Sequence, residues 1–222
     1  MTHQNWRLEV LPVGPFRMNA VLLTGDGPDG PECILVDPGD EAPRLLGRIE
    51  ASGARLVALL ATHGHLDHVG AAAEIQDVHP LPLRCHPDDV PIIARLPEFQ
   101  AGYGLPRTRV PRTSADLEDG ARVPFAGGEI EVRHVPGHSP GELMLVLHGM
   151  SPLHALVGDC LFHGSVGRTD LPGGDFATLE KSIRERIYTL PDETVVVSGH
   201  GPDTTVGHER TTNPFVRGLD AG

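Results

Sequence analysis

A dense group of metal-ligating side chains directly after an apolar run constrains this chain more than any other feature. Residues 56–61 (LVALLA) are continuously apolar, as is typical of a strand buried on both faces of a sheet. Residues 62–70 (THGHLDHVG) follow at once, and residues 71–76 (AAAEIQ) have a helix-forming composition. The ligating side chains are therefore expected on a loop between a buried strand and a helix.

The side chains of this loop are suited to a divalent metal. His63, His65, Asp67 and His68 offer imidazole and carboxylate groups, which are ligands for zinc, iron or manganese. They are too close in sequence for one regular helix face, but a tight loop can turn them towards two neighbouring points. The alternative is a surface loop that merely contains histidines, and the density of ligand types after a buried strand disfavours it.

Three further candidate ligands follow other apolar runs. His138 lies in HVPGHSPGE, Asp159 in LVGDCLF and His200 in VVVSGHGP. Because each lies in a small-residue turn after an expected strand, the three can converge on one edge of the fold. Seven ligands exceed the capacity of one tetrahedral metal and suit two metals that share a carboxylate and a water. The sequence therefore predicts a binuclear centre.

The remaining pattern predicts an α/β fold of two stacked sheets with helices outside. The first forty residues suggest an antiparallel meander. A short helix follows with Asp40 as candidate N-cap and Gly53 as its stop, and a later amphipathic helix has Asp175 as N-cap and Phe176 on its apolar stripe. Residues 80–128 predict a short strand, a helix near residues 88–95 and a long surface excursion. Strands, helix, buried strand and loop occur twice, which suggests the two stacked sheets, and the chain length suits one domain, residues 1–222.

Charge and composition narrow the expected partners. The chain has 30 acidic and 18 basic side chains and a net charge of −12, so it should repel nucleic acid. No apolar run approaches the roughly twenty residues of a membrane-spanning helix, and no secretory signal is recognisable. Cys33, Cys85 and Cys160 are odd in number and widely spaced, which suits free thiols in a reducing compartment. We expect a cytoplasmic protein with a small-molecule substrate.

The His-x-His-x-Asp-His motif resembles the hallmark loop of the metallo-β-lactamase superfamily. The later motifs agree in type and order, and the resemblance runs from NAVLL and LVDPG to the last histidine. It implies an αββα sandwich of two mixed β-sheets flanked by helices. It assigns His63, His65 and His138 to the first metal, Asp67, His68 and His200 to the second, and Asp159 as the bridge between them.

The same resemblance implies roles for residues beside the ligands. Asp37 in LVDPG recurs in the family as a support for the ligand loop, and a simple strand-end turn aspartate is the alternative. GDCLF resembles the Gly-Asp-x-Leu-Phe of the hydrolase branch, so Cys160 should point into the core. True β-lactamases of this fold can place a metal-binding cysteine near here. Because Asp159 and not Cys160 is the expected ligand, antibiotic hydrolysis is disfavoured. His134 is expected to hold its turn by hydrogen bonds.

A binuclear centre of this kind implies hydrolysis of an acyl bond. Two divalent ions, with zinc favoured and iron or manganese as alternatives, lower the pKa of a bridging water to give a hydroxide, and polarise the carbonyl. Asp67 is the candidate catalytic residue, because it lies close to the nucleophile and can orient it and shuttle a proton. A thioester, with its good leaving group, fits this chemistry well.

The expected substrate contact is Arg168, in a segment that resembles the short glyoxalase II-like branch. Arginine can clamp a carboxylate through paired hydrogen bonds, whereas a surface pair with Asp170 or Asp175 is the alternative. Full-length glyoxalase II enzymes have an aromatic residue where Asp170 stands and a helical domain that grips glutathione, yet only 22 residues follow His200. The favoured function is hydrolysis of S-acylglutathione-like (hydroxyacylglutathione) or related thioesters.

Other activities remain open alternatives. Persulfide dioxygenases share the fold and a Gly-Arg-Thr-Asp phrase, matched by residues 167–170, and would use His63, His138 and Asp159 around a single iron. The short tail favours the hydrolase. Lactonase and β-lactamase-type hydrolysis use the same chemistry. A catalytically weak metal-binding protein is disfavoured because the ligand set is complete.

Overall fold

The buried apolar run at residues 56–61 lies inside a six-stranded sheet. The computed structural model describes residues 5–103 and 109–217. The first sheet has its strands in chain order, the first three antiparallel and the later ones parallel. These strands are β1 (Arg7–Val13), β2 (Met18–Gly27), β3 (Gly30–Val36), β4 (Arg55–Leu60), β5 (Leu83–Arg84) and β6 (Thr113–Ser114). The predicted meander and the predicted inner strand are both confirmed.

A second mixed sheet packs on the first, with strand order β14-β13-β10-β9-β8-β7. Its strands are β7 (Arg122–Phe125), β8 (Gly128–His134), β9 (Leu143–Leu147), β10 (His154–Leu156), β13 (Val195–Val197) and β14 (Thr204–Thr205). A separate hairpin of β11 (Leu161–Phe162) and β12 (Ser165–Val166) follows β10.

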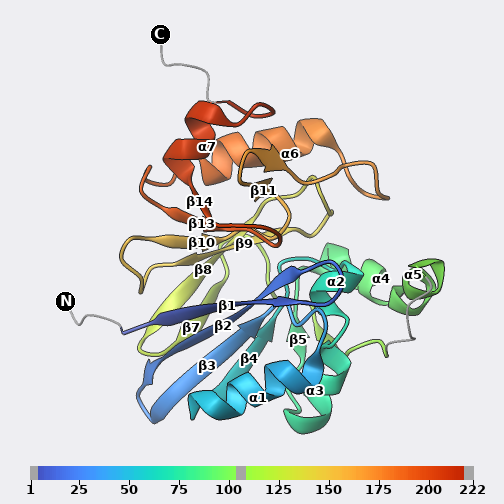
Figure 1. Ribbon diagram of the computed structural model, residues 1–222, viewed down its shortest axis with the longest axis vertical. Coiled ribbons are helices and arrows are strands. Elements are labelled where there is room, and N and C mark those ends of the chain that lie inside the picture. Colours follow the sequence, from blue (N-terminus) through green and yellow to red (C-terminus); the bar gives the residue numbers. More distant parts are fainter. Residues whose placement is uncertain (1–4, 104–108, 218–222) are drawn as a thin grey trace.

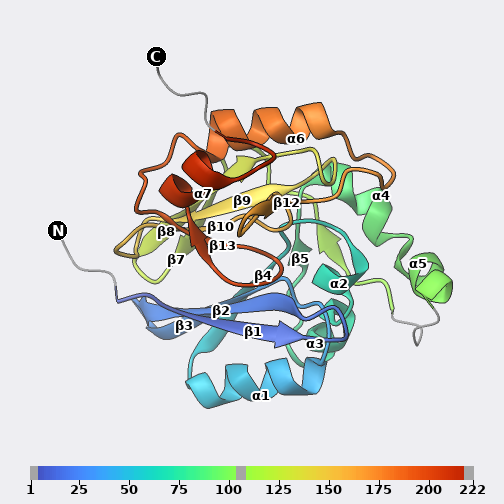
Figure 2. The ribbon, with the colours of Figure 1, turned by 45° about the horizontal axis from the view of Figure 1, so that its top comes forward.

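Helices cover the outer faces of both sheets. Figure 2 shows α1 beyond the first sheet and α6 beyond the second, so the chain forms the predicted αββα sandwich. The helices are α1 (Ala42–Ser52), α2 (Leu66–Val69), α3 (Ala72–Val78), α4 (Val90–Ile93), α5 (Leu96–Tyr103), α6 (Phe176–Ser182) and α7 (Val206–Thr212). A 3-10 turn (Pro87–Asp89) precedes α4, and a π-helical turn (Ile183–Ile187) continues α6. Among the residues described, no helix is both long and apolar enough to cross a bilayer.

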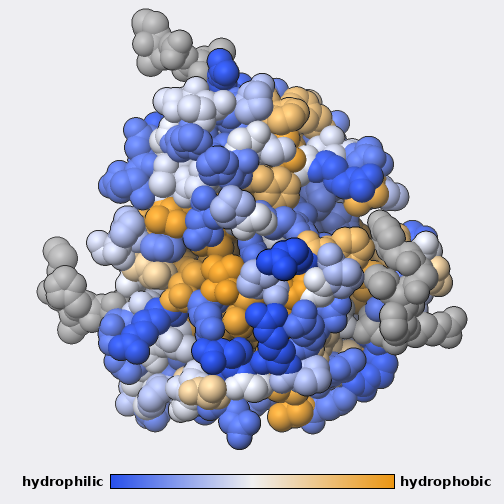
Figure 3. Space-filling view, viewed as in Figure 1, coloured by the Kyte–Doolittle hydropathy of each residue, from blue (hydrophilic) through white to orange (hydrophobic). Residues whose placement is uncertain are grey.

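The inner strands of the two sheets are buried on both faces, which explains the apolar runs in β3, β4 and β9. Along β3, Ile34 and Val36 pack into the cluster between the sheets, while Cys33 and Leu35 pack against the helical layer beneath. Strand β9 divides its side chains in the same alternating way between the central cluster and the layer under α6. On the face in Figure 3, apolar side chains are visible between the two halves and hydrophilic ones surround them.

Several local expectations were wrong. The N-cap of α1 is Glu41, in the left-handed conformation at φ 53°, and Asp40 instead accepts a hydrogen bond from the Glu41 N–H at 2.6 Å. Gly53 ends the helix as predicted. Asp175 caps α6, but Phe176, expected on its buried stripe, is 42% exposed.

The segment between β4 and β7 contains more secondary structure than its sequence indicated. The helix expected near residues 88–95 is present as the 3-10 turn and α4, but α5 and β6 lie in the expected surface excursion. Proline- and glycine-rich composition concealed them, because short elements held by tertiary packing leave a weak periodic signal. Residues 104–108 of that excursion lie outside the described part of the chain.

Replacing a central core residue should test the packing of the two sheets. Leu145 on β9 is fully buried in the cluster between them. Leu145→Ala should lower the free energy of unfolding by about 2–5 kcal/mol, because it leaves a cavity. Urea denaturation measures this, with Val78→Ala as control, since Val78 is 59% exposed. Equal losses in the two variants would contradict the proposed packing.

Candidate metal centre

Four strands, β4, β8, β10 and β13, lead into the segments that carry the seven predicted ligands (Figure 1). His63 and His65 follow β4. Asp67 and His68 are in the first turn of α2 rather than in a loop, which corrects the expectation for that part of the motif. The others lie in the turns after three strands of the second sheet: His138 after β8, Asp159 after β10 and His200 after β13.

The side chains gather into two groups. Ligand atoms of His63, His65 and His138 lie within 4.8 Å of one another, and we call this the first group. Within it, Nδ1 of His65 is 2.9 Å from Nε2 of His138. Asp67, His68 and His200 form the second group, in which Oδ2 of Asp67 is 3.2 Å from Nε2 of His200. These are the two sets that the resemblance assigns to two metals.

Asp159 stands between the two groups. Its Oδ1 is 3.3 Å from Nε2 of His68 in the second group. Its Oδ2 is 3.7 Å from Nε2 of His138 in the first group and 3.6 Å from Nε2 of His200 in the second. A carboxylate in this position can contact a metal in either group.

Buried polar atoms without hydrogen bonds show that the centre suits cations. Nε2 of His63, Nε2 of His68 and Oδ1 of Asp159 are buried and form no hydrogen bond within residues 5–103 and 109–217. Leaving such atoms unsatisfied is costly, and a divalent ion would satisfy them. Imidazole nitrogens and carboxylate oxygens fit zinc, iron or manganese. The ligand assignment itself stays a prediction, which this geometry supports.

Main-chain carbonyls orient two of the histidines. Nδ1 of His138 donates to the carbonyl of Arg168 at 2.8 Å, and Nδ1 of His200 donates to the carbonyl of Phe16 at 3.1 Å. A neutral imidazole carries one N–H, so donation from Nδ1 leaves the Nε2 lone pair free for a metal. The β1–β2 turn and the segment around Arg168 therefore help to hold the centre.

Buried carboxylate oxygens orient two more of the histidines. Nδ1 of His68 donates to Oδ2 of Asp37 at 2.9 Å, and Nδ1 of His63 is 3.3 Å from Oε1 of Glu142. Asp37 also accepts hydrogen bonds from the N–H and hydroxyl of Thr62, both at 2.7 Å. Carboxylates in contact with metal-binding histidines commonly fix their tautomer. The geometry supports the predicted supporting role of Asp37.

Glu142 was missed in the sequence. It is fully buried, and its Oε1 accepts a hydrogen bond from the N–H of Asp159 at 2.9 Å. A Cβ on Gly158 would lie 2.1 Å from this oxygen, so the approach requires glycine there. The available signal was its place in the sequence, immediately before the wholly apolar strand β9. An acidic side chain is rarely buried unless it has a specific partner.

The electrostatics of the centre keep part of the histidine set neutral. Burial, followed by the neighbouring His138, lowers the pKa of His65 to about 4. Burial and the nearby imidazoles also lower the pKa of His63 well below its usual value. For His68, burial acts in the same direction, but the carboxylates of Asp159 and Asp37 outweigh it and raise the pKa. Neutral imidazoles retain the lone pair that a metal requires.

The chain was compared with known proteins. The model of the Metallo-beta-lactamase superfamily matches residues 13–200. The chain belongs to this superfamily. Hydroxyacylglutathione hydrolase GloC of Haemophilus influenzae is 38% identical over 216 residues, covering 94% of this chain and 97% of that protein.

Two solved structures of the superfamily are similar over almost their whole length. TTHA1623, in a di-iron-bound form, is 39% identical with a TM-score of 0.81, covering 93% of this chain and 99% of that one. The BLEG-1 B3 metallo-beta-lactamase is 33% identical with a TM-score of 0.84, covering 96% of this chain and 100% of that one. The chain is thus a metallo-hydrolase of this superfamily.

A cavity of about 330 Å³ opens over the centre. Its lining includes ligand side chains from both groups and Asp159. The remaining walls are mostly apolar and consist of Phe16, Leu66, Phe99, Leu171 and Pro172, with Arg168 as the one basic residue among the lining residues described. An apolar cavity with a few polar groups at one end is typical of a small-molecule site.

Arg168 lines this cavity but also forms a surface ion pair. Its Nε and one terminal nitrogen donate to the two carboxylate oxygens of Asp170, both at 2.7 Å. These hydrogen bonds lower the pKa of Asp170 to about 2. Asp175, the other partner considered, caps α6 instead. A substrate carboxylate at Arg168 would therefore compete with Asp170.

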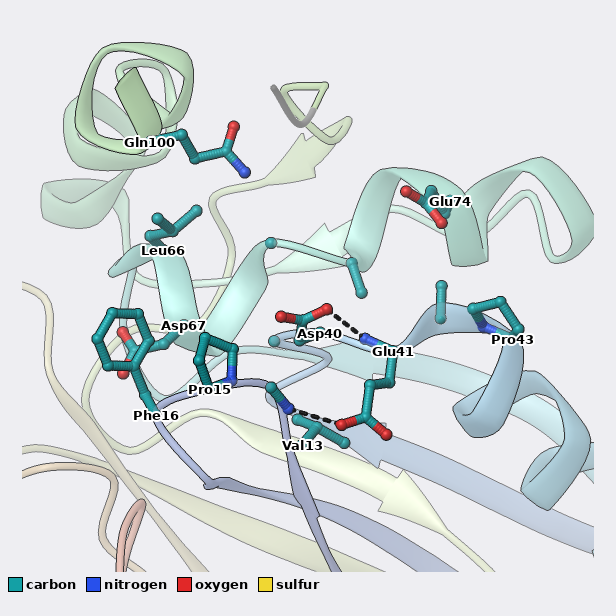
Figure 4. A pocket seen from close by; sticks show the side chains of 15 residues that line it. Val13, Pro15, Phe16, Asp40, Glu41, Pro43, Leu66, Asp67, Glu74 and Gln100 are labelled. Atoms are coloured by element: carbon teal, nitrogen blue, oxygen red, sulfur yellow. Dashed lines mark hydrogen bonds between the residues drawn. The ribbon is translucent and has the colours of Figure 1, made fainter. Parts of the chain in front are cut away.

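A second cavity of about 220 Å³ adjoins the first and shares Phe16, Leu66 and Asp67 with it. Figure 4 shows it between the β1–β2 turn and the start of α1. The Gly14 N–H donates to Oε1 of Glu41 at 2.9 Å and ties the turn to the helix. The side chain of Phe16 therefore borders both cavities, while its carbonyl orients His200.

Two further residues behave as expected outside the centre. Cys160 is fully buried under α6, and burial raises the pKa of its thiol, so it points into the core as predicted. Nε2 of His134 lies 2.8 Å from the carbonyl of Pro140 and holds its turn. His134 also stacks on His86, with ring centroids 4.1 Å apart and planes 6° apart. The nitrogen lone pairs of an imidazole lie in the plane of its ring. Because the two ring planes are nearly parallel, the rings do not point a nitrogen each at the same metal ion.

Changing Asp37 should test the support of the ligand loop. Asn in place of Asp37 offers one acceptor oxygen instead of two, so either Thr62 or His68 loses its partner. An amide N–H facing Nδ1 of His68 would favour the wrong tautomer. Asp37→Asn should weaken metal affinity about 10- to 100-fold. Competition with a chromophoric chelator measures this, and unchanged affinity would refute the role.

Proposed function

We propose that this metallo-hydrolase is a binuclear thioesterase acting on S-acylglutathione-like (hydroxyacylglutathione) or related thioesters. The observation that carries the proposal is the presence of two ligand groups with Asp159 in contact with both. The likeness to GloC, whose name states hydroxyacylglutathione hydrolysis, supports the substrate class. The likeness to TTHA1623 in a di-iron-bound form supports two metals.

The metals would be two divalent ions, with zinc favoured and iron the first alternative. His63, His65 and His138 would hold one ion, Asp67, His68 and His200 the other, with Asp159 shared. Bound ions would supply Lewis acidity, which lowers the pKa of a water and polarises an acyl carbonyl.

Asp67 is the proposed catalytic residue. Burial opposes its ionisation, but the hydrogen bond from His200 and the charges of His68 and His200 hold the pKa of its carboxyl well below the usual range. The side chain of Asp67, in its carboxylate form, lines the cavity over the centre. In that form it can accept a hydrogen bond from the attacking water and orient it towards the carbonyl.

The apolar walls and Arg168 would divide the binding of the substrate. Phe16, Phe99 and Leu171 offer surface for an acyl group or the carbon chain of a thiol. Arg168 would contact a carboxylate of the thiol portion in place of Asp170, since a solvent-exposed ion pair is weak.

Hydrolysis of a β-lactam is the second candidate, because BLEG-1 carries that description and is similar over the whole chain. Both reactions attack an acyl carbon and would use the same centre. Persulfide oxidation at a single iron would need only His63, His138 and Asp159. A complete second group, already gathered by the fold, favours a binuclear hydrolase over that alternative.

Removing one ligand of the second group should test the binuclear hydrolase. His68→Ala should reduce bound metal from two ions per chain to one and lower thioester kcat/KM by about 100-fold or more. Elemental analysis and hydrolysis of S-lactoylglutathione measure both. His148→Ala is the control, because His148 is an exposed histidine paired with Glu131.

Parallel assays separate the alternatives. Turnover of nitrocefin with no thioester cleavage would support the β-lactam reaction instead. One iron per chain with oxygen uptake on glutathione persulfide would overturn the hydrolase. Unchanged metal content in His68→Ala would refute the assignment of the second group.

Removing the ion pair between Arg168 and Asp170 should change how KM depends on the charge of the substrate. Asp170→Asn removes the bidentate ion pair. KM for S-lactoylglutathione, which carries carboxylates, should fall by about two- to five-fold, the size of an exposed ion pair. KM for the neutral thioester S-lactoyl-N-acetylcysteamine should not change. Equal effects on both substrates would show that Arg168 does not contact the carboxylate.

A further inference from the structure

Asp89 is a buried carboxylate behind the metal centre. It lies at the end of the 3-10 turn between β5 and α4 and is fully buried. Its Oδ2 accepts hydrogen bonds from the Gly64 N–H at 2.6 Å and the Ser139 hydroxyl at 2.9 Å. Its Oδ1 accepts one from the Gly141 N–H at 2.7 Å. One carboxylate therefore joins two loops that are more than seventy residues apart in the chain.

Both loops carry ligands of the first group. Gly64 lies between His63 and His65, and Ser139 directly follows His138. The two hydrogen bonds to Oδ2 thus hold the loop after β4 and the loop after β8 at one point. Among the described residues, the side-chain hydrogen bonds of Asp89 go to Gly64, Ser139 and Gly141 and not to a ligand atom, so its effect on a metal would act through the position of the loops.

The contact between Asp89 and these loops is too close for larger residues. A Cβ added to Gly141 would lie 2.7 Å from Oδ1 of Asp89, and one added to Gly64 would lie 3.0 Å from its carbonyl oxygen. Both distances are shorter than ordinary contacts, so glycine at these positions is what allows the carboxylate to reach the loops. Two glycines and one hydroxyl shaped around one carboxylate indicate a specific arrangement.

The segment that carries Asp89 is anchored in the core. Ile93 on α4 and Leu96 at the start of α5 are buried in the cluster beneath the first sheet. This packing fixes the position of the carboxylate relative to β4. The second group has a different support, since Asp37 holds His68 and the Phe16 carbonyl holds His200.

We propose that Asp89 is a positioning residue that sets the metal affinity of the first group, His63, His65 and His138, with little effect on the second group. By accepting hydrogen bonds from both loops, it holds the three imidazoles in one binding arrangement before the ion arrives. This preorganisation lowers the cost of ordering the ligands on binding. The inference rests on the proposed binuclear centre.

Asp89→Asn tests the inference, because it keeps the size of the side chain and replaces one acceptor by an N–H donor. That donor would face either the Gly141 N–H or the two donors on Oδ2. The affinity of each group for Zn²⁺ is measured separately, by chelator competition, in two backgrounds. His68→Ala leaves the first group complete, and His138→Ala leaves the second.

We expect Asp89→Asn to weaken Zn²⁺ binding about 10- to 100-fold in the background that retains the first group. In the background that retains the second group the change should be below about two-fold. Ser139→Ala removes one of the three hydrogen bonds and should weaken the same group by a smaller factor. If Asp89→Asn does not fold, Ser139→Ala carries the same comparison.

Glu209→Gln is the matched control. Glu209 is also fully buried and accepts hydrogen bonds from the Gly164 N–H, the Thr204 hydroxyl and the Asn213 amide. Glu209 joins α7 to β14 and to the β11–β12 hairpin, and none of these partners is next to a ligand in the chain. Glu209→Gln should therefore lower the melting temperature while both Zn²⁺ affinities persist. A general loss of stability therefore cannot imitate the expected result.

The outcomes separate this inference from the proposed function. Equal weakening of both groups by Asp89→Asn, or no weakening of the first, would overturn the positioning role while the binuclear centre stands. Failure of the unsubstituted protein to bind two ions would instead overturn the binuclear centre. Selective weakening of the first group by Asp89→Asn and Ser139→Ala supports the inference.

Discussion

The cost of keeping imidazole and carboxylate groups away from water governs the organisation of this fold. Nε2 of His63 and His68 and Oδ1 of Asp159 are buried, and the described residues provide them with no hydrogen bond. A native structure tolerates such atoms where a bound group satisfies them. The surrounding protein must then hold each ligand from its other side, since the ligands would otherwise rearrange to bond one another.

Buried carboxylates perform much of that holding. Asp37, Asp89 and Glu142 come from three different segments, and each accepts a main-chain N–H from a residue that is, or adjoins, a ligand. Asp37 directly follows the buried end of β3, Glu142 directly precedes the buried strand β9, and Asp89 ends the 3-10 turn before α4. Arg168 and Phe16 connect the centre to the cavity, because their carbonyls orient His138 and His200 while both residues line the substrate space.

The strand pattern and the ligand motif could be predicted because their causes are local. Strands β3, β4 and β9 contain apolar runs because those parts of the strands are buried on both faces. The capping role of Asp40 was wrong because Glu41 adopts a left-handed conformation and bonds to the distant Gly14 N–H. Helix α5 was missed although its Phe99 lines the cavity, because tertiary contacts support that short element more than its own periodicity does.

The sequence by itself determined the αββα class, the motif at residues 63–68 and the later ligands at strand ends, because each is written in consecutive residues. Only the tertiary structure decided how closely the two groups of candidate ligands approach Asp159, and that Glu142 and Asp89 lie behind them. It also decided that Arg168 pairs with Asp170. These contacts join residues from different strands and loops. Their distances are set by the packing of the two sheets, which no local sequence pattern encodes.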